Sequence, residues 1–130
     1  MGRTPATIRG VEKTATDLLA AARGQVKEIS IADLRRRQNE DPALLVLDVR
    51  ERDETEEGTI PGARWLRRGF LELRIESLAA RNTPLVLYCA GGARSLLAAA
   101  TLRAMGYCEV SSLLGGIRAW RQAGHPVERP

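Results

Sequence analysis

Two short, almost wholly apolar segments do most to limit what this chain can fold into. They are Leu44–Val49 (LLVLDV) and Pro84–Tyr88 (PLVLY), and polar or glycine-rich sequence follows each of them. Apolar runs of about four to eight residues are typical of strands that are covered on both faces, as in a parallel sheet. Because parallel strands are joined by crossover connections, which are usually helices, the chain should alternate strands and helices.

The sequence around these two runs fits that alternation. Ser30 is a predicted helix N-cap, with Asp33 as its capping-box partner and Ile29 and Leu34 in the flanking apolar positions. Further strands are predicted at 26–29, 63–66 and 109–114, and helices or helical turns at 31–38, 51–57, 69–80, 94–105 and 116–123. The pattern predicts a three-layer α/β fold, with helices on a mostly parallel sheet.

The first 25 residues differ from the rest of the chain. Residues 1–11 are polar and aperiodic, and residues 14–17 are able to cap a short helix at 18–23 that Gly24 would end. We expect residues 1–25 to form a partly mobile extension and residues 26–130 to form the domain. The sequence leaves open whether the short helix packs on the domain or serves as an interaction segment.

Composition narrows the class of protein. A chain of 130 residues with 44% apolar and 28% charged residues has the profile of one globular domain. It has no apolar run near the roughly 18 residues that span a bilayer and no secretory signal pattern, so we expect no membrane partner and a cytoplasmic location. The oligomeric state cannot be read from the sequence.

Arginine supplies most of the positive charge. The net charge is +4, and 18 of the 20 basic residues are Arg, but they form no long block and only five residues are aromatic. Nucleic-acid binding is therefore disfavoured against an ordinary basic surface, although an RNA partner stays an alternative that steep salt dependence would reveal.

The scarcity of histidine and cysteine restricts the chemistry. His125 is the one histidine, and the two cysteines, Cys89 and Cys108, lie in different local contexts. This set has no zinc-ligand spacing and no disulfide framework, so we expect no bound metal. Catalysis would have to use a thiol, carboxylates, arginine or backbone groups.

One segment has the layout of a nucleophile site. Cys89 ends a predicted buried strand, and a loop of small residues leads into the next helix. Such a loop lets successive N–H groups converge above the sulfur, and the helix N-terminus adds positive potential, so the thiolate would be stabilised without a histidine. The guanidinium of Arg94 would add donors for an anion. The loop residues are Ala90, Gly91, Gly92, Ala93, Arg94 and Ser95.

Each of these features also has a structural interpretation. A cysteine at a strand end is often a small buried apolar residue, but two glycines and an arginine are not needed for a plain turn. Cys108 has no such loop, which favours a structural role. Asp48 and Arg50 lie at the end of a predicted buried strand, where their simplest roles are a backbone hydrogen bond and an ion pair. Trp120 is a predicted core residue.

Four segments together resemble the single-domain rhodanese family of sulfurtransferases. They are residues 47–51 (LDVRE), 58–63 (GTIPGA), 89–95 (CAGGARS) and 114–120 (LGGIRAW) with 123–127 (AGHPV), in the family's order. Thr59 stands where the family often has His, and Thr55 where an aromatic residue is common, so local packing there is less certain.

The resemblance implies a five-stranded parallel sheet and a cysteine that carries sulfur. Cys89 would accept a sulfane sulfur and become a persulfide, and residues 90–95 would cradle that sulfur. Arg94 would help to bind an anionic donor such as thiosulfate, and no cofactor would be needed. Asp48 and Arg50 match the family's motif after the second strand and would be supporting residues. The donor would be a small molecule or a protein persulfide, and the acceptor a thiol or cyanide.

Two other functions use the same fold. Dual-specificity phosphatases and some arsenate reductases have one more residue between Cys and Arg, which makes room for a tetrahedral oxyanion, whereas four residues separate Cys89 from Arg94. A non-catalytic or sulfur-sensing module is the other alternative, and loss of the cysteine, its usual sign, is not seen here.

Overall fold

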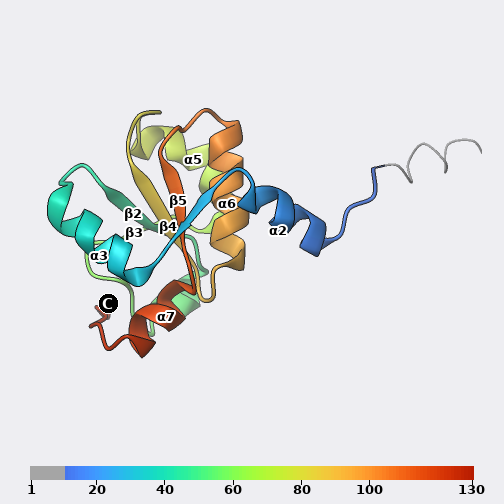
Figure 1. Ribbon diagram of the computed structural model, residues 1–130. Coiled ribbons are helices and arrows are strands. Elements are labelled where there is room, and N and C mark those ends of the chain that lie inside the picture. Colours follow the sequence, from blue (N-terminus) through green and yellow to red (C-terminus); the bar gives the residue numbers. More distant parts are fainter. Residues whose placement is uncertain (1–10) are drawn as a thin grey trace, which may run out of the picture.

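The protein is an α/β structure with three layers, which confirms the predicted fold class (Figure 1). The computed structural model describes residues 11–130. Its five strands form one sheet in the order β1-β5-β4-β2-β3, and all neighbouring pairs are parallel. The strands are β1 (Lys27–Ile29), β2 (Leu45–Asp48), β3 (Arg64–Trp65), β4 (Leu85–Tyr88) and β5 (Val110–Leu113).

Helices or helical turns connect successive strands, as the alternation predicts, and one further helix lies at each end of this series. They are α2 (Ala15–Arg23), α3 (Ile31–Glu40), α4 (Arg52–Thr55), the 3-10 turn η1 (Arg68–Phe70), α5 (Leu71–Leu78), α6 (Ala93–Ala104) and α7 (Gly116–Gln122). Most predicted bounds differ by one or two residues. The helix predicted at 69–80 is instead a 3-10 turn followed by a shorter α-helix, and Gly69 in that turn disfavours a regular helical start.

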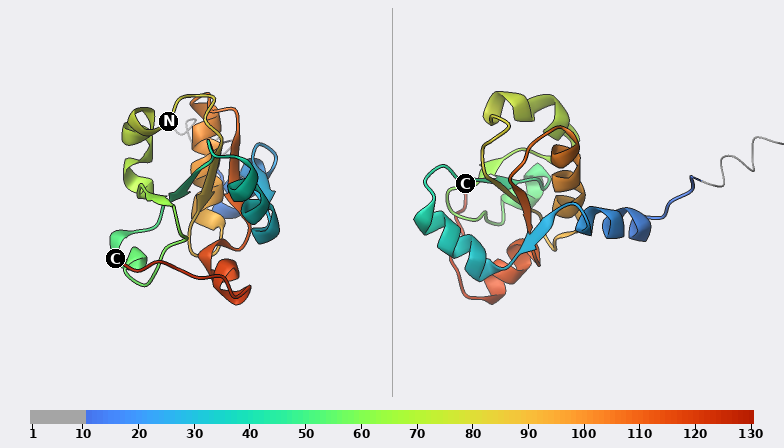
Figure 2. Two further views of the ribbon diagram at one scale, coloured as in Figure 1. Left: turned by 90° about the vertical axis from the view of Figure 1, so that its left-hand side faces the viewer. Right: turned by 45° about the horizontal axis from the view of Figure 1, so that its top comes forward.

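The two faces of the sheet carry separate apolar cores. On β4, Leu85 and Leu87 pack under α2, α5 and α6, whereas Val86 and Tyr88 pack under α3 and α7. Figure 2 shows helices on both sides of the sheet. Because β4 is buried along its whole length, its sequence has no polar alternation. Trp120 is a core residue, as predicted.

The helix α2 packs on the domain. Its Ala22 is 2% exposed and belongs to the same core as residues of α6, and Leu19 packs against that core. Figure 1 shows the C-terminal end of α2 beside α6. Thr14 caps the helix through a capping box with Asp17, and Gly24 is its C-cap. The C-terminal part of this helix thus packs on the domain, and a role of α2 as an interaction segment stays a prediction. The division at residue 25 stays a prediction, and residues 1–10 of the predicted extension lie outside the described part of the chain.

The direction of the strands separates the two cysteines. Cys89 follows the C-terminal end of β4, whereas Cys108 precedes the N-terminal end of β5. Since β4 and β5 are parallel neighbours, the thiols lie at opposite edges of the sheet. Both are free; Cys89 is buried, and Cys108 is exposed rather than part of the core.

Candidate active site

The loop after β4 directs hydrogen-bond donors at one sulfur atom. The amides of Gly92 and Ser95 donate to Sγ of Cys89 over 3.1 and 3.4 Å. Gly92 is the N-cap of α6 and has φ +110°, a conformation that favours glycine, and an added Cβ would lie 3.3 Å from the amide nitrogen of Gly115. The predicted nest of N–H groups around Cys89 is therefore present, at the N-terminus of a 12-residue helix.

The start of α7 holds the other side of the loop. The amides of Ile117 and Arg118 donate to the carbonyl oxygens of Cys89 and Ala90, over 2.9 and 3.1 Å. With those two carbonyls bound to α7, the backbone presents its N–H groups to the sulfur. Gly116 makes this approach possible, because its φ is +60° and an added Cβ would lie 2.5 Å from the oxygen of Ala90.

A methyl group at Gly116 should damage the loop. Gly116→Ala is expected to lower the free energy of unfolding by more than the about 1–2 kcal/mol that a left-handed residue costs, because backbone must also move. The rate of Cys89 alkylation should also be lower in this variant. Gly62→Ala is the control: Gly62 also has positive φ (+83°), but no atom lies within 4 Å of its added Cβ. If urea unfolding gave equal losses of unfolding free energy for the two variants, the contact between Gly116 and the loop would be unimportant.

Hydrogen bonds favour the thiolate of Cys89. Burial raises the pKa of this thiol, but the hydroxyl of Ser95 and the amides of Ser95, Gly92 and Gly91 outweigh it, and the net pKa is lowered. Ser95 Oγ lies 3.5 Å from Sγ and 2.8 Å from Oγ of the buried Ser112 on β5. When Ser112 donates to Ser95, the hydroxyl hydrogen of Ser95 has two acceptors within reach, the carbonyl oxygen of Gly92 at 3.2 Å and the Cys89 sulfur, and a charged thiolate is the stronger acceptor of the two.

Removing the Ser95 hydroxyl should move the pH profile of Cys89 toward higher pH. A thiolate fraction rises as pH passes upward through the pKa, so a donor that lowers the pKa brings reactivity to lower pH. In a Cys108→Ser background, Ser95→Ala should slow iodoacetamide alkylation at pH 6 by about three- to tenfold, the factor that one hydrogen bond is worth. The two alkylation rates should converge at pH values above the pKa of the Cys89 thiol in both proteins. An unshifted profile would show that the hydroxyl does not act on the sulfur.

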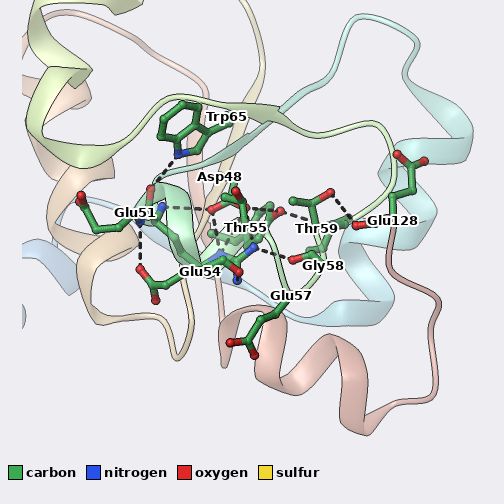
Figure 3. A network of polar contacts seen from close by, with 12 residues as sticks. Asp48, Glu51, Glu54, Thr55, Glu57, Gly58, Thr59, Trp65 and Glu128 are labelled. Atoms are coloured by element: carbon green, nitrogen blue, oxygen red, sulfur yellow. Dashed lines mark hydrogen bonds and ion pairs between the residues drawn. The ribbon is translucent and has the colours of Figure 1, made fainter. Parts of the chain in front are cut away.

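Asp48 and Arg50 form a buried pair behind the loop. Their exposed fractions are 1% and 3%, and Nη2 of Arg50 lies 2.7 Å from Oδ2 of Asp48. Tyr88 donates to the same carboxylate over 2.8 Å, and Arg50 donates to the carbonyls of Glu54 and Gly58. Figure 3 shows Asp48 at the centre of this network. The pair thus fixes the 51–60 segment.

The two threonines at positions of family divergence have local partners. The backbone of Thr59 pairs with that of Glu128 over 2.8 Å in both directions, and Oγ1 of Thr55 donates to the carbonyl of Arg52 (Figure 3). Trp65 and Phe70 are exposed to 44% and 38%, so neither is a core residue. Trp65 Nε1 donates to the carbonyl of Arg50 over 2.8 Å.

Arg94 has a carboxylate partner that the sequence did not reveal. Its two terminal nitrogens donate to the two carboxylate oxygens of Glu54, over 2.7 and 2.9 Å. The hydrogen bonds from Arg94 are the main cause that lowers the pKa of Glu54 to about 2, so the pair stays charged through the neutral range. The positive charge of Arg94 is therefore balanced at the mouth of the loop.

Three residues of the site were missed by sequence reasoning. Glu54 lies within a charged run and is 40 positions from Arg94, so no local pattern links them. Ser112 carried a usable signal, since a polar residue in an otherwise apolar strand calls for a partner. Gly116 was placed only at a helix start, because its contact with Ala90 depends on the packing of two distant loops.

Residues 11–130 contain neither a metal-ligand cluster nor a helix suited to crossing a membrane. These residues hold no group of three or more His, Cys, Asp or Glu side chains arranged to bind a metal ion. No helix in the same range has the length and apolar character needed to cross a membrane.

Known proteins resemble this chain over most of its length. The family model for the rhodanese-like domain matches residues 30–123. A sulfurtransferase of Allochromatium vinosum is 35% identical over 105 residues, which are 81% of this chain and 97% of that protein. A thiosulfate sulfurtransferase of Coxiella burnetii is 36% identical over 84 residues, or 65% of this chain and 77% of that protein.

A solved structure carries a different description. The protein of unknown function from Rhodopseudomonas palustris, described as a "Possible Tyrosine Phosphatase", is 32% identical with a TM-score of 0.82. The match covers 91% of this chain and 96% of that one. Its fold is the one seen here. With the family match covering strands β2 to β5, the Cys89 loop and α7, the chain belongs to the rhodanese-like domain family.

Proposed function

We propose that this protein is a sulfurtransferase that carries a sulfane sulfur on Cys89. The observation that carries the proposal is the convergence of the Gly92 and Ser95 amides and the Ser95 hydroxyl on one buried sulfur. Such donors stabilise both a thiolate and the outer sulfur of a persulfide anion. The sulfurtransferases among the relatives support this activity.

The reaction has two steps at sulfur, shown here with thiosulfate and cyanide. The Cys89 thiolate attacks the outer sulfur of thiosulfate; an Sγ–S bond forms, the S–S bond of thiosulfate breaks, and sulfite leaves with the electron pair. Cyanide or a thiolate then attacks the outer sulfur of the persulfide, and the Cys89 thiolate is released. Charge balances in both steps, and neither requires an oxidant or a metal.

The residues of the loop have separate roles in this proposal. Residues 90–95 form the cradle of the transferred sulfur. Arg94 contributes positive potential, but its two terminal nitrogens are bound to Glu54, so an anionic donor must share this arginine with a carboxylate. Asp48 and Arg50 act as positioning residues, since they hold the segment that contains Glu54. The donor is thiosulfate or a persulfide, and the acceptor a thiol or cyanide.

The mass of the intact protein tests the proposal. Incubation with thiosulfate should add one sulfur atom, and cyanide should then remove it as thiocyanate appears. The adduct should map to the peptide that contains Cys89 and not to the one with Cys108. If neither thiosulfate nor a small persulfide adds sulfur to the protein, the proposed function is wrong.

Phosphatase activity is the second candidate, because a similar structure is described in that way. The geometry of the loop favours sulfur transfer over phosphate hydrolysis. Four residues separate Cys89 from Arg94, one fewer than in the phosphatases of this fold, and the ring of donors is already closed around Sγ at 3.1–3.5 Å. Hydrolysis of p-nitrophenyl phosphate that depends on Cys89, without sulfur uptake, would favour the phosphatase.

A further inference from the structure

A groove beside the Cys89 loop has no role in the steps above. Its volume is about 320 Å³, and its wall includes Ala90 of the loop together with Arg118 and Arg121 of α7. Glu54 and Glu57 also line the groove. The groove is thus continuous with the site and is bordered by two arginines from a different element than Arg94.

The side chain of Arg118 lies directly against the loop. A Cβ added to Gly91 would lie 2.8 Å from Nη1 of Arg118, so the guanidinium rests on this glycine. The amide of Gly91 is one of the groups that lower the pKa of the Cys89 thiol. Arg118 therefore contacts the same residue whose backbone acts on the sulfur, while its own amide donates to Ala90.

The charges around the groove are unevenly balanced. Among residues 11–130, Arg94 forms an ion pair with Glu54, and the buried Arg50 forms one with Asp48. Both cations are thereby neutralised by a carboxylate in direct contact.

Arg118 and Arg121 differ from those two arginines. Within the described part of the chain, neither lies within ion-pair distance of a carboxylate, and both are exposed. Arg121 donates to the carbonyl of Glu57 rather than to its carboxylate. Glu57 lines the same groove, and its carboxylate is in none of the ion pairs of residues 11–130, so the two arginines of α7 leave one positive charge in excess at this groove.

We propose that Arg118, assisted by Arg121, binds the anionic end of the sulfur donor. This inference rests on the proposed function. In thiosulfate, the outer sulfur would face Sγ while the sulfonate oxygens bind the guanidinium in the groove. Arg118 would offset the repulsion between a thiolate and a dianion, and would stabilise the negative charge that leaves on sulfite as the S–S bond breaks. The ligand class is a sulfane donor with a sulfonate or carboxylate tail.

Donors that differ only in tail charge test the proposal. Arg118→Gln should lower kcat/KM for thiosulfate by about ten- to hundredfold, as expected for loss of a charged hydrogen-bond partner. Glutathione persulfide, which has a carboxylate tail, should show a loss in the same direction. With 2-hydroxyethyl persulfide, whose tail is uncharged, kcat/KM should change by less than about twofold, and Arg118→Lys should restore most of the thiosulfate rate.

A matched control and a binding measurement complete the test. Arg103→Gln removes one positive charge near the other end of α6, about 15 Å along the helix from the loop, and should leave both donors unaffected. In a Cys89→Ser background, where no transfer occurs, thiosulfate should perturb the NMR signal of the Arg118 Nε–H group. The Arg118→Gln version should bind thiosulfate more weakly.

The outcomes separate this inference from the proposed function. If the unaltered protein takes sulfur from neither kind of donor, both are overturned. If it takes sulfur and Arg118→Gln uses thiosulfate at an unchanged rate, only the role of Arg118 is wrong. An equal loss with the charged and uncharged donors would assign Arg118 to the structure of the loop instead, and would also overturn the inference.

Discussion

Cys89→Ser is expected to remove sulfur transfer and leave the fold intact. A serine hydroxyl stays protonated at neutral pH and cannot hold a persulfide, so the rate of thiocyanate formation should fall by at least about 10⁴-fold. The substitution is nearly isosteric, and the amides of Gly92 and Ser95 can donate to an oxygen as to a sulfur. The urea midpoint should therefore change little. Rates in a continuous thiosulfate–cyanide assay provide the measurement.

Cys108→Ser is the matched control for the nucleophile. Cys108 is exposed, and its strand places it at the opposite edge of the sheet from the loop. Among the described residues, the only polar contact of the Cys108 thiol is with the carbonyl of Arg81, at 3.5 Å. Transfer by Cys108→Ser should match that of the unaltered protein. An inactive Cys108→Ser protein beside an active Cys89→Ser protein would show that the other thiol carries the sulfur.

The sequence was most informative where local chemistry determines the structure. The apolar runs at 44–49 and 84–88 became the buried strands β2 and β4, because only strands covered on both faces need such continuous apolar sequence. Ser30 caps α3 with Asp33, as predicted, since a capping box involves only neighbouring residues. The donors around Cys89 likewise come from within six residues of it.

Contacts between distant segments account for what the sequence could not show. The charged run at 51–57 has several acidic residues, and only the folded chain selects Glu54 to face Arg94. Trp65 is a large apolar residue, yet it lies on an edge strand of two residues and is exposed. The charge balance at the site also depends on which side chains pair in the folded chain. Composition alone cannot show that, among residues 11–130, Arg118 has no carboxylate within ion-pair distance.

Asp48→Asn is expected to destabilise the protein by about 3–5 kcal/mol, because it leaves the buried Arg50 charge without its partner. Asparagine has nearly the same shape, so packing should not account for the loss. Since Arg50 also holds the carbonyls of Glu54 and Gly58, the 51–60 segment should loosen, and its amide hydrogens should exchange faster.

The control for Asp48→Asn is a charge removed from an exposed pair. Glu72→Gln breaks a pair in which Arg68 lies 2.9 Å from the carboxylate, and it should cost less than about 1 kcal/mol because solvent screens that interaction. Urea unfolding at constant m-value gives both free energies. Because a domain of this size is stabilised by only about 5–15 kcal/mol, the loss at Asp48 would take a large share of the total. Equal effects of the two variants would show that Asp48 is dispensable, and that other contacts position Glu54 opposite Arg94.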